Sequence, residues 1–187
     1  MTGAPAGAAT RPRLGGIRVG AVAALLMVVA GATHSGRTSA ETSRFLPWTE
    51  APPAAFALKD LAGRSTSMAD YRGKVVLVSF WATWCEFCRE QMLAMRRLRE
   101  QLAGQPFEIV AVNYGESSAK VREYVRSLSV DFPVILDPSQ EGARAWRVRV
   151  LPVSFVVAPD GRPRYTVLGE FDWASEEALE TIRELLH

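Results

Sequence analysis

The chain has 187 residues, of which 48% are hydrophobic and 22% are charged, and its formal net charge is +2. This length suits one domain with a buried core and is too short for two ordinary domains in addition to a separate N-terminal segment. The charged content excludes wholesale disorder. Residues 1–40 hold four arginines and no acidic residue, so the rest carries 18 basic and 20 acidic residues, a net charge of −2. Bulk charge therefore predicts no nucleic-acid partner.

Residues 1–40 form a separate segment, which we interpret as an export signal or an N-terminal membrane anchor. Arginines at its start precede an uninterrupted run of apolar and small residues at 19–32, and Ala30-Gly31-Ala32 fits a small-x-small cleavage site. The same run is barely long enough to span a bilayer. Both alternatives predict an extracytoplasmic protein on the periplasmic side of the inner membrane, either tethered by residues about 17–35 or released after cleavage near Ala32.

Residues 41–54 are rich in Ser, Thr, Ala and Pro and read as a linker, so the folded domain is expected at 55–187. Periodicity and turn signals predict the following elements in chain order: a hairpin of 56–58 and 65–66, a helical turn at 68–71, a strand at 74–81, a helix at 85–102, a strand at 107–112, a helix at 117–128, a strand at 133–136, a short helix at 139–146, a hairpin of 153–157 and 164–168, and a helix at 175–186. This alternation indicates an α/β fold with a sheet covered by helices.

The chain has two cysteines, Cys85 and Cys88, placed between its strongest predicted strand and a helix. Unpaired N–H groups and the helix dipole at the N-terminus of the helix favour the Cys85 thiolate, which is the attacking species. Cys88 lies one turn further along and can then attack Cys85 to release a reduced substrate. In an exported protein a C-x-x-C pair in this context predicts a redox-active disulfide.

Other uses of the cysteine pair remain open. A copper-binding chaperone or a thiol sensor could use the same thiolates, although the histidines, His34 and His187, lie in the export segment and at the last position. A purely structural disulfide between the two neighbouring cysteines is a further alternative. A thiol peroxidase is less well supported, because the residues before Cys85 lack the peroxidatic Pro-x-x-x-Thr-x-x-Cys pattern. We predict no metal site and no bound cofactor.

Three segments make a resemblance specific: SFWATWCEFC, VAVNYGES and VLPVSFVVAPDGR. Over residues 55–186 the chain resembles the ResA/TlpA group of thioredoxin-like thiol–disulfide oxidoreductases. The resemblance implies a thioredoxin-like fold, in which a central mixed β-sheet is flanked by helices, with an N-terminal β-hairpin and a helix-plus-strand insertion at 117–136. It also implies that Cys85 is the nucleophile and Cys88 the resolving thiol.

The resemblance extends to the surroundings of the two cysteines. Pro152 matches the cis-proline of the group, which exposes the backbone of Leu151 for pairing with a substrate, whereas the residues alone also allow an ordinary trans proline at a strand start. Trp84 and Phe87 flank the thiols and are expected to shape the substrate-binding surface. Glu86 matches an acidic residue of the group's motif.

The sequence departs from the group at two positions where a buried carboxylate is usual. Ser79 stands where thioredoxins carry an acid, and Gln91 stands where ResA-like proteins often carry Glu. Glu86 and Glu116 are candidate electrostatic modulators, since a nearby negative charge disfavours the Cys85 thiolate and raises the thiol pKa. Each also has a simpler interpretation: a solvated charge in the first helical turn for Glu86, and a loop or cap role for Glu116.

These observations predict an extracytoplasmic enzyme that reduces specific protein disulfides by dithiol exchange. A less stable thiolate makes a less oxidising pair, which favours a reductant. The resemblance suggests apocytochrome c or the thiols of a copper-insertion protein as substrates, and a membrane thiol carrier as the electron donor. The membrane itself is a partner if the N-terminal segment stays uncleaved.

Overall fold

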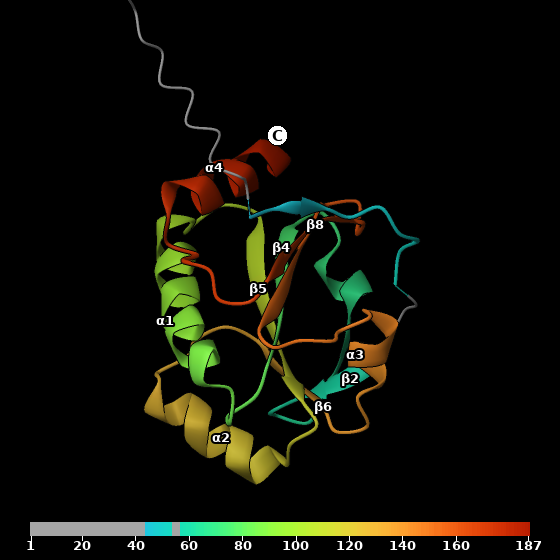
Figure 1. Cartoon of the computed structure of the whole chain (residues 1–187), viewed down its shortest axis with the longest axis vertical. Helices are drawn as coiled ribbons and strands as arrows, with labels where there is room; N and C mark the ends of the chain where they lie inside the picture. Colours follow the sequence, from blue (N-terminus) through green and yellow to red (C-terminus); the bar gives the residue numbers. More distant parts are fainter. Residues whose placement is uncertain (1–43, 54–56) are drawn as a thin grey trace, which may run out of the picture. The chain divides into compact units, whose positions relative to one another are not determined.

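The computed structural model describes residues 44–53 and 57–187, so the predicted export segment lies outside the described residues. The elements along the chain are β1 (Leu46–Pro47), β2 (Ala57–Asp60), β3 (Ser65–Ser67), the 3-10 helix η1 (Met68–Tyr71), β4 (Val75–Trp81), α1 (Glu86–Gln101), β5 (Phe107–Tyr114), α2 (Ser118–Ser127), β6 (Val134–Asp137), α3 (Glu141–Ala145), β7 (Val153–Val157), β8 (Pro163–Leu168) and α4 (Glu176–Leu185) (Figure 1). Within the described part, no helix combines the length and apolarity needed to cross a membrane.

The strands form one mixed sheet in the order β1-β8-β7-β4-β5-β6-β2-β3. β4 pairs with β5 in parallel, and β5 pairs with β6 in parallel. The remaining neighbours are antiparallel. The predicted central mixed sheet is thus confirmed, with β4 inside it and every β4 residue buried, as its β-branched, apolar composition predicts.

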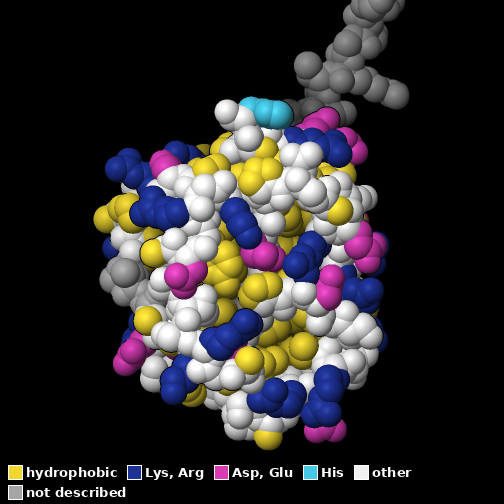
Figure 2. Space-filling model, turned by 180° about the vertical axis from the view of Figure 1, so that it is seen from behind, with side chains coloured by type: hydrophobic (Ala, Val, Ile, Leu, Met, Phe, Trp, Pro, Cys, Tyr) yellow, Lys and Arg dark blue, Asp and Glu magenta, His cyan; other side chains and the backbone are white. Residues whose placement is uncertain are grey.

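Two hydrophobic layers cover the two faces of the sheet, because successive β4 side chains point to opposite sides. Val75, Leu77 and Trp81 belong to the layer that α1, α2 and α4 cover. Val76, Val78 and Phe80 belong to the layer on the side of α3 and η1. Figure 1 shows α1 beside β4 and β5, with α3 on the other side of the strands. In Figure 2, basic and acidic side chains are interspersed over the face drawn there.

The two predicted hairpins, the strand–helix–strand order of β4, α1 and β5, and the helix-plus-strand insertion all form at the expected places, with boundaries that shift by a few residues. One difference concerns the predicted linker at 41–54. Within it, Leu46–Pro47 pairs antiparallel with β8, with Leu46 opposite Thr166. Phe45 is 6% exposed and belongs to the α1-side core. A two-residue strand has too short a pattern for periodicity to reveal, and a distant aromatic cluster holds it in place.

Candidate active site around Cys85 and Cys88

The two cysteines are joined in a disulfide at the start of α1, with 5.4 Å between their Cα atoms. Cys85 is the N-cap residue of α1, and the backbone N–H of Cys88 donates to the Cys85 carbonyl oxygen at 3.2 Å. Cys85 is 7% exposed, whereas Cys88 is fully buried. The more accessible cysteine therefore lies at the helix end where backbone N–H groups favour a thiolate. This arrangement suits Cys85 as the attacking thiol and Cys88 as the resolving thiol.

The residues next to the disulfide are open to solvent. Trp84 is 63% exposed and Phe87 is 56% exposed. Glu86 is also exposed, in the first turn of α1. Trp81, four residues before Cys85, is instead buried and stacks on Tyr124 with 5.5 Å between ring centroids. The disulfide thus has an apolar rim on its outer side and a packed core on its inner side.

The Leu151–Pro152 peptide bond is cis. Its position relative to the disulfide follows from the sheet register, in which Phe80 of β4 lies opposite Val153 of β7. Because the pairing is antiparallel, the residues before Val153 continue alongside the end of β4, from which the chain runs to Cys85. The structure therefore brings Leu151 and Pro152 to the C-terminal end of β4, where the loop that carries Cys85 begins. Their role in substrate binding stays a prediction.

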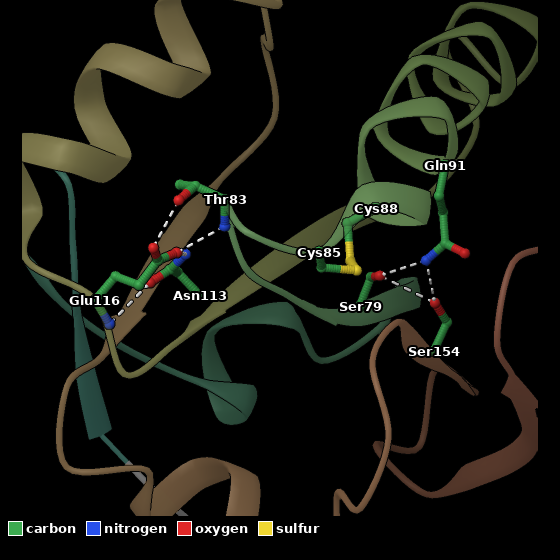
Figure 3. Close-up of a disulfide and its surroundings, with 8 residues drawn as sticks. All are labelled: Ser79, Thr83, Cys85, Cys88, Gln91, Asn113, Glu116 and Ser154. Carbon is green, nitrogen blue, oxygen red and sulfur yellow. Dashed lines mark hydrogen bonds between the residues drawn. A yellow bond between two sulfur atoms is a disulfide. The ribbon is translucent and has the colours of Figure 1, made fainter.

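Glu116 binds the loop that precedes Cys85. Its Oε2 accepts the backbone N–H of Thr83 at 2.7 Å, and its Oε1 accepts the Thr83 hydroxyl at 2.6 Å (Figure 3). The side-chain amide of Asn113 donates to Oε2 at 2.9 Å, and Lys120 forms an ion pair at 2.7 Å. Burial acts to raise the pKa of Glu116, but the hydrogen bonds donated by Lys120, Thr83 and Asn113 outweigh burial and bring the pKa to about 2.

This geometry gives Glu116 a definite structural role. The carboxylate is charged at neutral pH and fixes the loop two residues before Cys85 through both of its oxygens. The positive charge of the Lys120 ammonium partly offsets the negative charge of Glu116, which weakens the electrostatic effect of Glu116 on the thiols. Sequence reasoning did not identify Thr83 and Asn113 as partners, because the three residues meet only where the ends of β4 and β5 lie side by side.

A second polar group lies on the α1 side of the sheet. The Gln91 Nε2 donates to the hydroxyl oxygens of Ser79 at 3.0 Å and Ser154 at 3.2 Å, and the Ser154 hydroxyl donates to Ser79 at 3.0 Å (Figure 3). All three side chains are at most 2% exposed. Gln91 Oε1 is buried and has no hydrogen-bond partner among the described residues. The sequence identified Ser79 and Gln91 as departures but missed Ser154, which the β4–β7 register places opposite Ser79.

Among residues 44–53 and 57–187, no group of three or more Cys, His, Asp or Glu side chains lies in an arrangement able to hold a metal ion. Disulfide exchange needs no such group, since the reacting atoms are sulfur.

Comparison with known proteins places this site in a family. A family model for "AhpC/TSA family" matches residues 49–166. The thiol-disulfide oxidoreductase ResA of Bacillus subtilis (strain 168) is 38% identical over 114 residues, which cover 61% of this chain and 64% of the relative. ResA of Geobacillus kaustophilus (strain HTA426) is 33% identical over 129 residues, which cover 68% of this chain and 74% of the relative.

The solved structures agree with the sequence comparison. The crystal structure of a thiol:disulfide interchange protein, DsbE, from Chlorobium tepidum is similar with a TM-score of 0.68 and 26% identity, covering 73% of this chain and 96% of that one. The thioredoxin-like fold is thereby shown. Together with a family model that matches well over half of the chain, these findings establish that the chain belongs to the AhpC/TSA family of redoxins, with relatives of the ResA type.

Proposed function

We propose that the protein is an extracytoplasmic thiol–disulfide oxidoreductase that reduces protein disulfides by dithiol exchange. The observation that carries the proposal is the Cys85–Cys88 disulfide at the N-terminus of α1, in which Cys85 is 7% exposed and Cys88 is fully buried. The relatives' name, thiol-disulfide oxidoreductase, supports the same chemistry.

The reaction has two steps. In the dithiol form, the Cys85 thiolate attacks one sulfur of a substrate disulfide, and the other substrate sulfur leaves as a thiolate that takes a proton from water. The Cys88 thiol then loses its proton and attacks Cys85 Sγ, which forms the Cys85–Cys88 bond and breaks the mixed disulfide. Two electrons pass to the substrate, and the enzyme is left oxidised, as in the present structure.

The direction, location and substrates belong to the same proposal. Glu86 in the first turn of α1 opposes a Cys85 thiolate, which favours a reductant over an oxidant. The apolar, basic-flanked segment at 1–40 supports an extracytoplasmic location. The resemblance to the ResA/TlpA group suggests apocytochrome c or copper-insertion protein thiols as substrates. A membrane thiol carrier would then return the enzyme to its dithiol form.

Cysteine variants test the proposal. Cys85→Ala should abolish the reduction of insulin disulfides in the presence of a dithiol donor, since the attacking sulfur is gone. Cys88→Ala should form the first bond and then stop, so mixed disulfides with the substrate should accumulate on non-reducing gels. Activity that survives in Cys85→Ala would contradict the proposal.

Two other outcomes would favour the competing functions. Stoichiometric, tight binding of Cu(I) by the reduced protein without insulin reduction would indicate a copper chaperone. Rapid turnover of hydrogen peroxide that depends on Cys85 would indicate a thiol peroxidase.

A further inference from the structure

Cys88, the resolving thiol, needs a polar neighbour, a place that a buried carboxylate usually takes. Cys88 is fully buried at the inner side of the disulfide, and its thiolate must form there before it attacks Cys85. A thiolate in an apolar surrounding is costly unless a donor stabilises it. At the two positions where a carboxylate is usual, this chain has Ser79 and Gln91, neither of which ionises.

The fold places these neutral side chains on the same side of the sheet as Cys88. Cys88 and Gln91 are three residues apart on α1 and both are buried, so they occupy the same face of the helix. On β4, Ser79 lies between Leu77 and Trp81 in the alternation, and both of these belong to the core layer that contains Cys88. Figure 3 shows the three polar side chains gathered on the side of the disulfide away from Thr83.

The hydrogen bonds leave one hydroxyl proton unused. The Gln91 Nε2 donates to Ser79 and to Ser154, and the Ser154 hydroxyl donates to Ser79. Of the two hydroxyl protons in the group, these bonds use one. The remaining proton belongs to Ser79, whose oxygen already accepts twice. The Ser79 hydroxyl therefore has a proton that the bonds within the group do not use.

We propose that Ser79 donates this proton in a hydrogen bond to the Cys88 sulfur when the disulfide opens, and that Gln91 and Ser154 position it. This inference rests on the proposed function and deepens it. The group stabilises the Cys88 thiolate by a fixed dipole, and it does not accept the Cys88 proton as a carboxylate would. That proton passes to water, the thiolate attacks Cys85 Sγ, and the substrate sulfur leaves with the electron pair of the broken bond.

The charged side chains around Cys88 do not duplicate this role. On α1, Glu86, Arg89 and Glu90 are exposed, and Arg89 pairs with Glu90. From the β5–α2 side, Glu116 is engaged by Lys120 and Thr83. The buried polar side chains that β4 and β7 contribute beneath α1 are the two serines, and they carry no charge.

The test measures the ionisation of Cys88 in the full chain carrying Cys85→Ser, so that Cys88 is the only thiol, by the ultraviolet absorbance of the thiolate against pH. Adding Ser79→Ala should lower the acid dissociation constant of Cys88 about tenfold, the usual effect of losing a hydrogen bond to a charged group. Ser79→Thr, which keeps the hydroxyl, should stay within about threefold of the parent. Ser127→Ala, at an exposed serine of α2, is the matched control.

A second variant keeps the proposal testable if Ser79→Ala does not fold. Gln91→Glu places a carboxylate in the group, so its charge should lower the dissociation constant of Cys88 at least as much as Ser79→Ala does. The proposal is overturned if Ser79→Ala changes the constant by less than about threefold, if the Ala and Thr variants shift it equally, or if Gln91→Glu leaves it unchanged. These readings do not depend on turnover, so a parent that fails to reduce insulin would contradict the proposed function alone.

Discussion

At the scale of single residues, Trp84 and Phe87 expose 63% and 56% of their surfaces on either side of Cys85. Exposed apolar side chains that lie close together mark interaction sites, and aromatic side chains dominate the energetics of protein interfaces. A protein substrate that buries these two rings beside the Cys85 sulfur would be held in place while its disulfide reacts. A small disulfide has too little surface to use the same contact.

We therefore expect Trp84→Ala to lower kcat/KM for insulin by about tenfold and to leave the exchange rate with a small symmetrical disulfide nearly unchanged. Parallel kinetics on the two substrates measure the difference. Leu46→Ala, at an exposed apolar residue of β1, serves as the control. An equal loss on both substrates would indicate that Trp84 acts on the thiols themselves and not on substrate binding.

Also at this scale, the low pKa of Glu116 has a consequence for stability. A carboxyl whose pKa falls from 4.5 to about 2 on folding stabilises the folded state above the unfolded pKa. That contribution is lost as the pH falls from about 4.5 through about 2. Its size is on the order of 2 kcal/mol, after allowance for solvent around the Lys120 ammonium.

Glu116→Gln should consequently lower the free energy of unfolding by about 2 kcal/mol at pH 7. The difference from the parent should stay constant down to about pH 4.5 and narrow as the pH approaches 2. Urea unfolding at a series of pH values measures it, with Glu123→Gln at an exposed position of α2 as control. A difference that does not change with pH would show that the hydrogen bonds to Thr83 matter and the charge does not.

At the scale of elements, β1 shows how a short segment is held by a cluster far away in the chain. Phe45 makes edge-on contacts with Tyr165, Phe171 and Trp173, with ring centroids between 5.3 and 5.7 Å apart. These rings come from β8 and from the loop before α4. Two strand residues alone would not order the segment, so the aromatic cluster stabilises β1 and covers that edge of the sheet.

Phe45→Ala should destabilise the protein by about 3 kcal/mol, the usual cost of removing a buried aromatic ring. Thermal and urea unfolding measure this loss. Leu46→Ala, next to it but 47% exposed, should change stability by less than about 0.5 kcal/mol. Equal, small effects of both variants would mean that residues 45–47 act as a linker after all.

At the scale of the folded unit at 41–187, one sheet serves both hydrophobic layers. β4 contributes alternate residues to each layer, and its central place means that neither layer persists without it. A single cooperative unit should result, even though helices cover the two faces separately.

Unfolding in urea should accordingly show one transition, with the same midpoint by far-ultraviolet circular dichroism and by tryptophan fluorescence. Trp81 and Trp173 report on the α1-side layer, and Trp48 and Trp146 report on the other. Replacing both Trp48 and Trp146 by Phe separates the two signals. Midpoints that differ between the layers would contradict a shared core.

The order of the elements and the cysteine pair could be predicted from the residues alone. A strand such as β4, apolar and β-branched throughout, and helices with clear periodicity are specified by local pattern, and C-x-x-C at a strand–helix junction constrains its chemistry strongly. Three features could not be predicted from the residues alone, because each joins residues far apart in sequence. They are the register of β7 against β4, the aromatic cluster around Phe45 and the partners of Glu116. Their contacts depend on which strands become neighbours. The same holds for Ser154: nothing local distinguishes it, and only the antiparallel pairing of two buried strands places its hydroxyl against Ser79 and Gln91, where a neutral group takes the place of the usual carboxylate.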